Sequence, residues 1–353
     1  MIESIRLQKF RSYGDASFEF EPGVNIVVGP NASGKTNLLE AVLVLARGSS
    51  YRARDVELIQ FSEYWARLDG YFSQGTNRSL KLELEGEQLQ KTYLIEDKPY
   101  RRISLDKTIP VVYFEPNHLQ LITRGPDQRR DYFDELLERS LPGYKTNLNS
   151  YRRALAQRNA LLKHGPQAGQ QQLFAWNVRL SELGEKIAAA RGGLVDKINQ
   201  DLSKTYSKIS KRKSELMLNY DSQFPISGYA NRLLASLERN IQADYQRGFT
   251  SHGPHREDFS FELNGQNANV SASRGETRSI MLALKIFELN LIEEARGERA
   301  IFLLDDVFSE LDSGRRKALV KYLKDRQTII TTTDADTVIE YFTATTKIIP
   351  LTR

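Results

Sequence analysis

The stretch Gly29-Pro30-Asn31-Ala32-Ser33-Gly34-Lys35-Thr36 is a complete G-x-x-x-x-G-K-[ST] phosphate loop. Residues 24–28 are expected to form a buried strand before it, and residues 37–42 a helix after it. The N-terminus of such a helix favours anions, and glycines let the backbone N–H groups curl around phosphate oxygens. The motif therefore predicts a nucleotide site in which Lys35 reaches the β and γ phosphates and the hydroxyl of Thr36 holds Mg²⁺. The alternative is an ordinary glycine turn between a strand and a helix.

The composition is that of an ordinary water-soluble chain, with 353 residues, 40% of them apolar and 27% charged. This length predicts two or three lobes. The sequence has no cysteine, which excludes disulfides, zinc–thiolate sites and thiol catalysis. No run approaches the roughly 18 apolar residues of a membrane span, and the first residues lack the apolar region of a signal peptide. We therefore expect a soluble, cytoplasmic protein.

Positive charge is concentrated in one segment of the chain. The net charge is +5, whereas residues 151–213 alone contain thirteen Lys and Arg against four Asp and Glu. The local excess is 13 − 4 = 9, so the rest of the chain sums to 5 − 9 = −4. Solubility does not require such a concentration, which indicates an anionic partner.

The first part of the chain is predicted to be rich in β-structure. Alternating apolar residues indicate a first hairpin that turns at residues 13–15, followed by further strands separated by polar turns. The strands are expected at residues 2–7, 16–20, 24–28, 65–72, 79–84, 91–95 and 110–114.

Helical periodicity begins after Pro126. Helices are expected around residues 132–137 and 148–162, and a long one from about residue 170 with an apolar stripe like that of a coiled coil. Gly192-Gly193 is expected to kink or break this helix. Together these segments predict a short arm of two or three antiparallel helices.

The remaining chain mixes helices and strands. Asn264-Gly265 is a strong two-residue hairpin signal. Strands are expected at residues 214–220, 258–263, 268–271, 300–304, 328–332 and 347–351, and helices at 229–245, 275–295 and 313–324.

Four apolar residues followed by Asp305 and Asp306 form a second candidate motif at residues 301–306. In a phosphate-loop nucleoside triphosphatase such a strand is the Walker B element, whose first carboxylate steadies Mg²⁺ while the second polarises the attacking water. Asp305 takes the metal role and Asp306 the role of base. Taken alone, the pattern also fits a buried strand that simply leaves the core.

Two further strings surround this strand. Ser273-Arg274-Gly275-Glu276 opens an apolar helix, so that Ser273 and the backbone of Gly275 lie at a second helix N-terminus suited to anions. Ser309-Glu310-Leu311-Asp312 follows the two aspartates after two intervening residues. The alternative for the first string is a plain N-cap serine with a glutamate in the first turn.

The order of phosphate loop, S-x-G-[QE] string, Asp-Asp strand and S-E-L-D string resembles the ABC-type ATPases of the SMC and RecF group. Local strings resemble the RecF family over nearly the whole chain: Phe10-Arg11-Ser12-Tyr13, then Gly125-Pro126 with Arg129-Arg130 and Phe133-Asp134, and residues 253–258 (GPHRED). The resemblance implies an α/β ABC-type ATPase head, with an antiparallel β-subdomain and a short helical arm lobe. It assigns residues 1–125 to the N-terminal ATPase lobe, 126–213 to the arm and 214–353 to the C-terminal ATPase lobe.

The same resemblance implies that ATP with Mg²⁺ is enclosed between two subunits, because in this group the signature serine of one subunit contacts the γ-phosphate held by the other. The implied catalytic residues are Lys35, Ser273 and Asp306, and the metal ligands are Thr36 and Asp305. Nucleotide contacts are expected from the phosphate loop and from Arg11, Ser273, Gly275, Asp305 and Thr333.

Two departures from the wider group concern hydrolysis. The stretch Thr331-Thr332-Thr333-Asp334 stands where ABC transporters usually carry a switch histidine, so that Thr333 is expected to sense the γ-phosphate and hydrolysis to be slow. Glu276 stands where glutamine is usual, which adds a negative charge near the nucleotide.

The basic segment is expected to bind DNA without sequence preference, since no recognition helix or zinc finger accompanies it. A solvated helical arm with a basic bias is the alternative. The candidate residues are Arg152, Arg153, Lys204, Lys208, Lys211, Arg212 and Lys213, with Arg158, Lys163 and Lys197 in the same segment.

The function that the resemblance implies is recombinational repair. ATP would drive homodimerisation and clamping on double-stranded or junction DNA, and weak, DNA-stimulated hydrolysis would release it. RecO and RecR would be the partners in loading recombinase at single-strand gaps. Two alternatives are a transporter subunit, which predicts a switch histidine, and the ATPase head of another SMC-like or anti-phage system, which predicts an effector enzyme.

Overall fold

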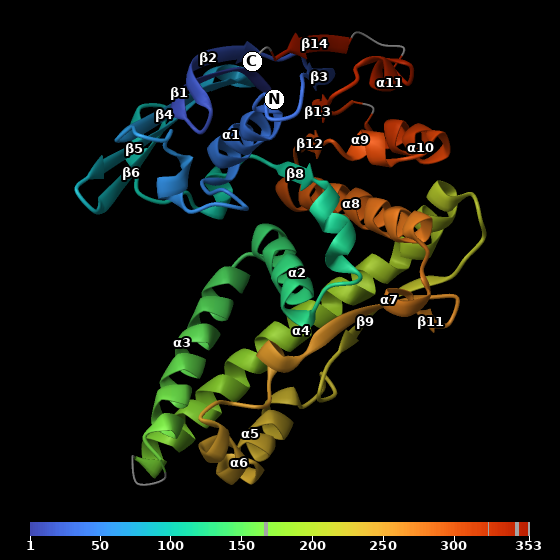
Figure 1. Cartoon of the computed structure of the whole chain (residues 1–353). Helices are drawn as coiled ribbons and strands as arrows, with labels where there is room; N and C mark the ends of the chain where they lie inside the picture. Colours follow the sequence, from blue (N-terminus) through green and yellow to red (C-terminus); the bar gives the residue numbers. More distant parts are fainter. Residues whose placement is uncertain (166–168, 324, 343–345, 352–353) are drawn as a thin grey trace. The chain divides into compact units, whose positions relative to one another are not determined.

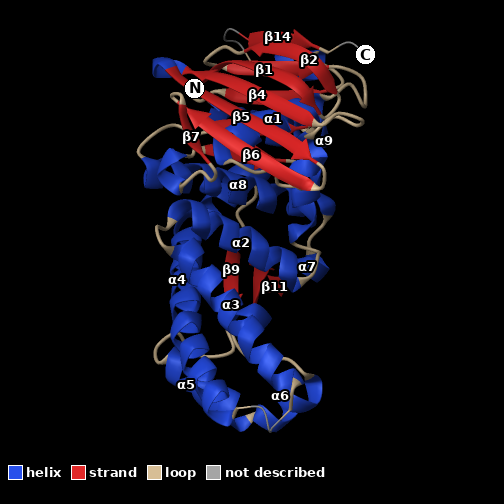
Figure 2. Ribbon diagram, turned by 90° about the vertical axis from the view of Figure 1, so that its left-hand side faces the viewer, coloured by secondary structure: helices blue, strands red, loops and turns tan. Residues whose placement is uncertain are grey.

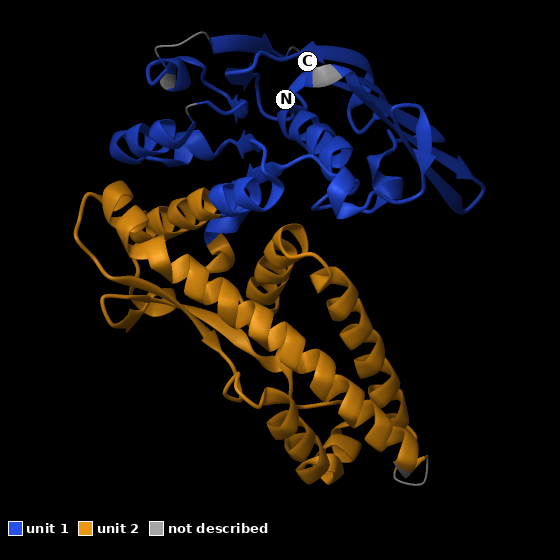
Figure 3. Cartoon of the chain, turned by 180° about the vertical axis from the view of Figure 1, so that it is seen from behind, with its two compact units in different colours: residues 1–119, 288–353 blue, residues 120–287 orange. Residues whose placement is uncertain are grey.

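The computed structural model describes residues 1–165, 169–323, 325–342 and 346–351. It divides into two compact units, the first formed by residues 1–119 and 288–353 and the second by residues 120–287 (Figure 3). Residues 214–287, grouped by sequence with the C-terminal ATPase lobe, therefore lie in the second unit with the helical arm. The reason is packing, since strands of this segment lie on the arm helices. Within the described ranges no helix is long and apolar enough to cross a membrane.

A five-stranded parallel sheet forms the centre of the first unit (Figure 1). Its order is β14-β3-β13-β12-β8, which separates the phosphate-loop strand β3 from β12 by a single strand. The inner strands are buried along nearly their whole length, as expected for a parallel sheet that is covered on both faces. The bounds are β3 (Val24–Val28), β8 (Val111–Phe114), β12 (Ile301–Asp305), β13 (Thr328–Thr332) and β14 (Thr346–Pro350).

A six-stranded antiparallel sheet in the order β2-β1-β4-β5-β6-β7 completes the first unit (Figure 2). Its first hairpin turns at Arg11 and Ser12, because Phe10 pairs with Tyr13, so the predicted turn at residues 13–15 is wrong. Arg11 takes a positive φ of 53° in this tight turn. The bounds are β1 (Ile2–Phe10), β2 (Tyr13–Glu19), β4 (Trp65–Phe72), β5 (Thr76–Glu85), β6 (Gln88–Ile95) and β7 (Lys98–Tyr100).

Helix α1 (Lys35–Arg47) packs on strands of both sheets. Every residue from Leu38 to Ala46 is buried, as expected for a helix that is apolar nearly all round. The N-terminus of α1 is thereby fixed against the parallel sheet. The other helices of this unit are α9 (Val307–Glu310), α10 (Ser313–Leu323) and α11 (Asp336–Ile339), with 3₁₀ turns at Asp55–Leu58, Ser73–Gly75, Leu105–Lys107 and Pro116–Leu121. The predicted end of α10 at Lys324 lies outside the described residues.

The second unit is mainly helical, with a small sheet in the order β11-β10-β9. Helix α8 crosses the boundary, since its residues 274–287 belong to this unit and the rest to the first. The helices are α2 (Pro126–Ser140), α3 (Tyr144–Lys163), α4 (Gln170–Ser210), α5 (Tyr229–Arg239), α6 (Ile241–Arg247), α7 (Ala268–Ser271) and α8 (Arg274–Arg296). The strands are β9 (Leu216–Asp221), β10 (Asp258–Leu263) and β11 (Gln266–Asn267), with a 3₁₀ turn at Pro254–Arg256.

Helix α4 runs for 41 residues through Gly192-Gly193, so the predicted break at this pair is wrong. Each glycine costs a helix about 1 kcal/mol relative to alanine. The buried residues Leu194, Val195 and Ile198 continue the apolar stripe directly beyond the pair. Packing of that stripe outweighs the cost of the two glycines.

Two other predicted elements differ in detail. The helix expected at residues 229–245 is divided into α5 and α6 at Asn240. The Asn264-Gly265 hairpin is confirmed, but its second strand ends at Asn267 and the expected strand at 268–271 is helix α7. The side chain of Asn267 accepts a hydrogen bond from the backbone N–H of Asn269, 2.9 Å away, which begins this helix.

Arg158 and Arg191 of the second unit are at most 2% exposed and form buried ion pairs. Arg158 is fully buried and donates to Asp244 at 2.7 Å and to Asn177 at 2.7 Å. Arg191 forms two hydrogen bonds of 2.9 Å with Asp134. Such pairs join helices distant in sequence, and losing one partner leaves a buried charge. Arg158, counted in the basic segment, is therefore a structural residue and does not reach DNA.

We predict that Gly193→Ala stabilises the protein by about 0.5–1 kcal/mol, because the exposed position lies inside a continuous helix and an added Cβ meets nothing within 4 Å. Chemical denaturation followed by circular dichroism measures this change. Gly184→Ala in the same helix is the control, since its Cβ would lie 2.9 Å from Leu233 and should destabilise. A destabilising Gly193→Ala would show that the helix is bent there.

Candidate nucleotide-binding site

The phosphate loop connects β3 to α1 in a tight left-handed turn. Ala32 and Gly34 have φ values of 65° and 99°. A Cβ on Gly29 would lie 2.8 Å from the backbone oxygen of Leu351, so only glycine fits there. The ammonium of Lys35 is buried and donates to the backbone oxygens of Gly29 at 2.8 Å and Pro30 at 3.1 Å. The lysine is thus folded back over its own loop.

The groups of this loop fit a bound phosphate. The hydroxyl of Ser33 is buried and has no hydrogen-bond partner within the described residues. A buried cation on Lys35 and free N–H groups at the start of α1 lie in the same turn. Phosphate oxygens would satisfy all three kinds of group. The strand–loop–helix setting that the sequence predicted is confirmed.

The carboxylate of Asp305 lies at the end of β12 and is 5% exposed. Its Oδ1 accepts hydrogen bonds from the hydroxyl of Thr36 at 3.1 Å and that of Thr331 at 2.7 Å. Its Oδ2 accepts one from the hydroxyl of Tyr113 at 3.0 Å. Hydroxyl and carboxylate oxygens suit Mg²⁺, which commonly takes one or two protein ligands together with water and substrate phosphates. The pair Thr36 and Asp305 fits that pattern.

Larger metal centres are not found in the part of the chain that the structure describes, where no group of three or more His, Cys, Asp or Glu could hold an ion. The oxygen atoms of Thr36 and Asp305 form the candidate metal position, and such hard ligands suit Mg²⁺ better than a thiophilic ion.

Asp306 follows in the left-handed conformation, with φ of 51°. Its N–H donates to the hydroxyl of Thr331 at 2.9 Å, so one threonine fixes both aspartates. Burial and the neighbouring Asp305 raise the pKa of Asp306, while Lys35 acts in the opposite direction. A raised pKa suits a carboxylate that accepts a proton from water.

In the S-E-L-D string that follows, the side chain of Asp312 accepts a hydrogen bond from the backbone N–H of Arg315 at 2.9 Å and thereby caps α10.

Glu40 on α1 is a fully buried carboxylate beside this site. Arg11 donates to both of its oxygens at 2.9 Å, and Arg52 and Ser50 donate at 2.9 and 2.6 Å. Burial alone would raise the pKa of Glu40, but the hydrogen bonds from Arg52, Arg11 and Ser50 together lower it. The third donor of Arg11 binds the backbone oxygen of Glu57 at 2.7 Å. Arg11 is thus engaged within its own unit, and its predicted nucleotide contact stays a prediction.

The threonine stretch is arranged differently from the expectation. Thr331 and Thr332 are buried at the end of β13, and Thr333 is exposed directly after it. Thr331 holds Asp305 and Asp306, a contact that sequence reasoning did not assign. The sensing role of Thr333 stays a prediction.

Ser273 and Gly275 belong to the second unit, whereas the phosphate loop and both aspartates belong to the first. Ser273 is exposed at the start of α8, and its hydroxyl and N–H donate to the same oxygen of Glu276 at 2.7 and 2.8 Å. The N–H of Glu276 donates back to the Ser273 hydroxyl at 3.3 Å. These reciprocal bonds form a capping box. The serine is therefore the N-cap that the plainer interpretation described.

Four side chains near Asp305 and α1 were missed by sequence reasoning, namely Tyr113, Tyr51, Arg52 and Glu40. Tyr113 lies on β8, which reaches Asp305 because β8 pairs with β12. No local pattern signals that pairing. For Glu40, a signal existed in its acidic side chain within α1, where the two residues on either side of it are apolar.

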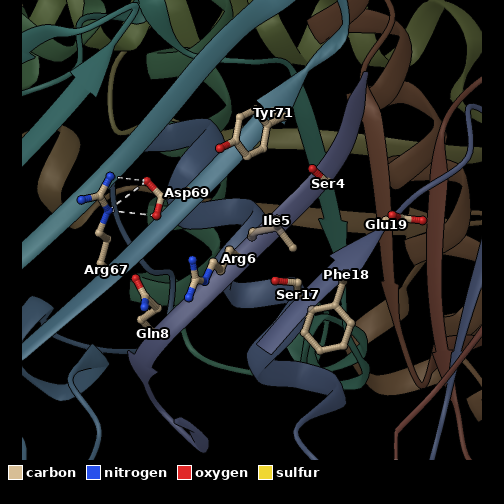
Figure 4. Close-up of a pocket in the computed structure, with 10 residues that line it drawn as sticks. All are labelled: Ser4, Ile5, Arg6, Gln8, Ser17, Phe18, Glu19, Arg67, Asp69 and Tyr71. Atoms are coloured by element: carbon tan, nitrogen blue, oxygen red, sulfur yellow. Dashed lines mark hydrogen bonds and ion pairs between the residues drawn. The ribbon is translucent and has the colours of Figure 1, made fainter. Parts of the chain in front are cut away.

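A separate cavity of about 490 Å³ lies on the antiparallel sheet, lined by residues of β1, β2 and β4 (Figure 4). Its arginines are already paired, Arg6 with Asp15 at 2.8 Å and Arg67 with Asp69 at 2.9 Å. None of the predicted site residues lines it. Its charges are balanced, and it is distinct from the phosphate loop.

The two sheets, the phosphate loop after β3 and the paired aspartates at the end of β12 define an ABC-type ATPase head. A family model described as the RecF/RecN/SMC N terminal domain matches residues 1–350. The chain is 37% identical over 343 residues to the DNA replication and repair protein RecF of Heliobacterium modesticaldum, covering 94% of this chain and 92% of the relative. It is 36% identical over 342 residues to RecF of Streptococcus uberis, with coverages of 95% and 93%. The chain belongs to the RecF family.

Solved structures agree with this membership. The structure of the recombination mediator protein RecF-ATPrS in the RecFOR pathway superposes with a TM-score of 0.85 at 30% identity, covering 96% of this chain and 94% of that one. That of RecF-ATP gives a TM-score of 0.84 at 30% identity, with coverages of 94% and 92%. The SmcHead bound to the C-winged helix domain of ScpA, at 18% identity and a TM-score of 0.54, shares the fold. The predicted ABC-type fold class is confirmed.

We predict that Glu40→Gln lowers the free energy of unfolding by about 2–3 kcal/mol at neutral pH, because two arginines lose their buried partner. The pKa of Glu40 is lowered on folding, so its stabilisation is full above the ordinary carboxyl pKa and is lost as the pH falls through the folded value. Denaturant titrations at neutral and acidic pH test this.

The control is Glu83→Gln, which breaks the exposed pair with Lys81 and should change stability by less than about 1 kcal/mol. A gap between wild type and Glu40→Gln that stays constant down to strongly acidic pH would contradict the assigned role of the Glu40 charge.

Proposed function

We propose that this protein binds ATP with Mg²⁺ and acts as an ATP-controlled, homodimeric DNA-binding protein of recombinational repair. The observation that carries the proposal is the phosphate loop with buried Lys35 and Ser33, joined to the Walker B strand by the hydrogen bond from Thr36 to Asp305. Membership in the RecF family supports ATP as the nucleotide, since a relative at 30% identity is described as RecF-ATP.

For hydrolysis, Lys35 exchanges its two backbone contacts for phosphate oxygens and Asp306 takes the proton of the attacking water. The water oxygen bonds to the γ-phosphorus, and the bond to the ADP oxygen breaks. Burial, which raises the pKa of Asp306, suits it to accept this proton. When bound, Mg²⁺ neutralises charge on the phosphates.

Dimerisation would follow from the signature string. In the proposed assembly, Ser273 of one copy contacts the nucleotide held by the phosphate loop of a second copy. Its hydroxyl is bonded to Glu276 within its own chain, so this contact must be exchanged. The exchange disfavours assembly and supports a weak, reversible dimer with slow hydrolysis. ATP then acts as a timer, because it shifts the population toward the closed dimer only while it is bound.

DNA is the proposed cargo. The predicted basic residues are exposed on the second unit, in two groups. Arg152 and Arg153 lie on α3, which packs antiparallel to α4 in the register set by the bond from Arg158 to Asn177. The other group begins on α4 at Lys204, roughly 30 Å further along by a rise of 1.5 Å per residue, and continues past the end of that helix at Ser210. That group is Lys204, Lys208, Lys211, Arg212 and Lys213.

The proposed partners are RecR and RecO, with which the protein would load recombinase at single-strand gaps in the cytoplasm. Support comes from the relatives, which are described as DNA replication and repair proteins and as part of the RecFOR pathway. A transporter subunit or an anti-phage ATPase head are the alternatives. The match to RecF relatives over 94% of the chain favours repair.

We predict that ATP, but not ADP, produces a dimer in size-exclusion chromatography with light scattering, and that duplex DNA strengthens it. Lys35→Ala should abolish nucleotide binding and remain monomeric. Ser273→Arg should bind ATP as wild type does, because the residue is exposed and outside the phosphate loop, yet fail to dimerise and to hydrolyse ATP.

A monomer at every ATP concentration, with no gain in DNA affinity, would refute the proposed clamp. A normal dimer of Ser273→Arg would refute only the contact between the signature serine and the second copy.

We predict that replacing Lys211, Arg212 and Lys213 by alanine weakens binding to duplex DNA and reduces the slope of log affinity against log salt by up to about three. Fluorescence anisotropy at several salt concentrations measures the slope. The matched control removes the same charge from exposed arginines of the neighbouring helices, Arg232, Arg239 and Arg247. Equal effects of the two triple variants would show that net charge, and not this group, attracts DNA.

A further inference from the structure

Tyr113 holds one side of the Walker B carboxylate. Its hydroxyl donates to Oδ2 of Asp305 at 3.0 Å, while Oδ1 receives the hydroxyls of Thr36 and Thr331. Tyr113 is 4% exposed and lies on β8, in the strand directly beside β12. The two carboxylate oxygens are thus distinguished, since Oδ1 is bound by α1 and β13 and Oδ2 by β8.

A second tyrosine determines how Tyr113 is hydrogen bonded. The hydroxyls of Tyr51 and Tyr113 lie 2.5 Å apart, with ring centroids 4.4 Å apart. Each hydroxyl has a single proton. When Tyr113 donates to Asp305, the short contact requires Tyr51 to donate to Tyr113. Oε2 of Glu115 lies 3.2 Å from the Tyr51 hydroxyl and 3.3 Å from that of Tyr113, and it receives neither proton in this arrangement.

The loop that carries Tyr51 is itself fixed to α1. Its neighbours Ser50 and Arg52 both donate to Glu40, at 2.6 and 2.9 Å, and Arg52 also donates to the side chain of Asn37 at 2.8 Å. Three consecutive residues therefore fasten this loop, two to the phosphate-loop helix and one to β8. A hydroxyl held in this way cannot turn freely, so the bond to Asp305 has a fixed direction.

We propose that Tyr113, held by Tyr51, is a positioning residue for the metal ion: it retains Oδ2 of Asp305 so that Oδ1 is presented, together with Thr36, to Mg²⁺. The inference rests on the proposed metal role of Asp305. Groups that orient a ligand by hydrogen bonding commonly change metal affinity by roughly 10–100-fold when removed. Tyr113 contacts Asp305 through Oδ2, the oxygen that is not bonded to Thr36. Loss of the Tyr113 hydroxyl should therefore weaken metal binding and leave the phosphate loop intact.

The test measures ATP affinity by calorimetry across a Mg²⁺ titration that starts in EDTA. Tyr113→Phe keeps the ring and removes the hydroxyl. It should raise the Mg²⁺ concentration for half-maximal tightening by roughly tenfold, with unchanged affinity for metal-free ATP. Tyr51→Phe should raise the same Mg²⁺ concentration by a smaller factor. In a protein that already carries Tyr113→Phe it should have no further effect, because Tyr51 acts through Tyr113.

The control is Tyr93→Phe, a tyrosine of the same unit that is 2% exposed and whose hydroxyl has no partner within the described residues. It should titrate as wild type. The inference is overturned if Tyr113→Phe titrates as wild type, or if its metal-free ATP affinity falls by the same factor. The metal role of Asp305 is tested separately, since Asp305→Asn must lose the Mg²⁺ dependence; if it does not, the proposed site itself fails.

Discussion

The buried carboxylate of Asp305 is the interaction on which the nucleotide site depends. Hydroxyls from α1, β13 and β8 converge on it, namely those of Thr36, Thr331 and Tyr113. Hydroxyl donors orient a carboxylate without neutralising its charge, and burying an unneutralised charge is costly. A divalent cation relieves that cost. The fold thus places a buried carboxylate, which a bound cation would stabilise, directly beside the phosphate loop.

What could be predicted from the sequence is the chemistry carried by consecutive residues. The phosphate loop needs a strand, a glycine-rich turn and a helix in order, and the structure has β3, residues 29–34 and α1 in that order. Strand β13 is also found at the predicted residues 328–332. Tyr113 could not be found in this way. Its partner Asp305 is 192 residues away, and only the pairing of β8 with β12 brings them together.

Charge and glycine patterns were misleading where packing decides. Arg158 counts as one more cation in a basic segment, but it points into the second unit against Asp244. Sequence periodicity predicts the helix that contains Arg158 but not its partner, because Asp244 on α6 lies 86 residues further along the chain. Gly192-Gly193 likewise carries a local preference of about 1 kcal/mol per residue, which the apolar stripe of α4 outweighs. Local propensity is a small term whenever a long buried surface is available.

Glu276 affects Ser273 both as a helix cap and as a proposed nucleotide contact. As a capping residue it stabilises the start of α8, and its charge strengthens the hydrogen bond from the Ser273 hydroxyl at 2.7 Å. A phosphate of a second copy would have to compete with that charged acceptor for the same hydroxyl proton. A glutamine would compete less, because a neutral amide oxygen is a weaker acceptor. In the proposed assembly the carboxylate would therefore lower the affinity between the two copies while it stabilises the separate subunit, as expected for a dimer that opens again.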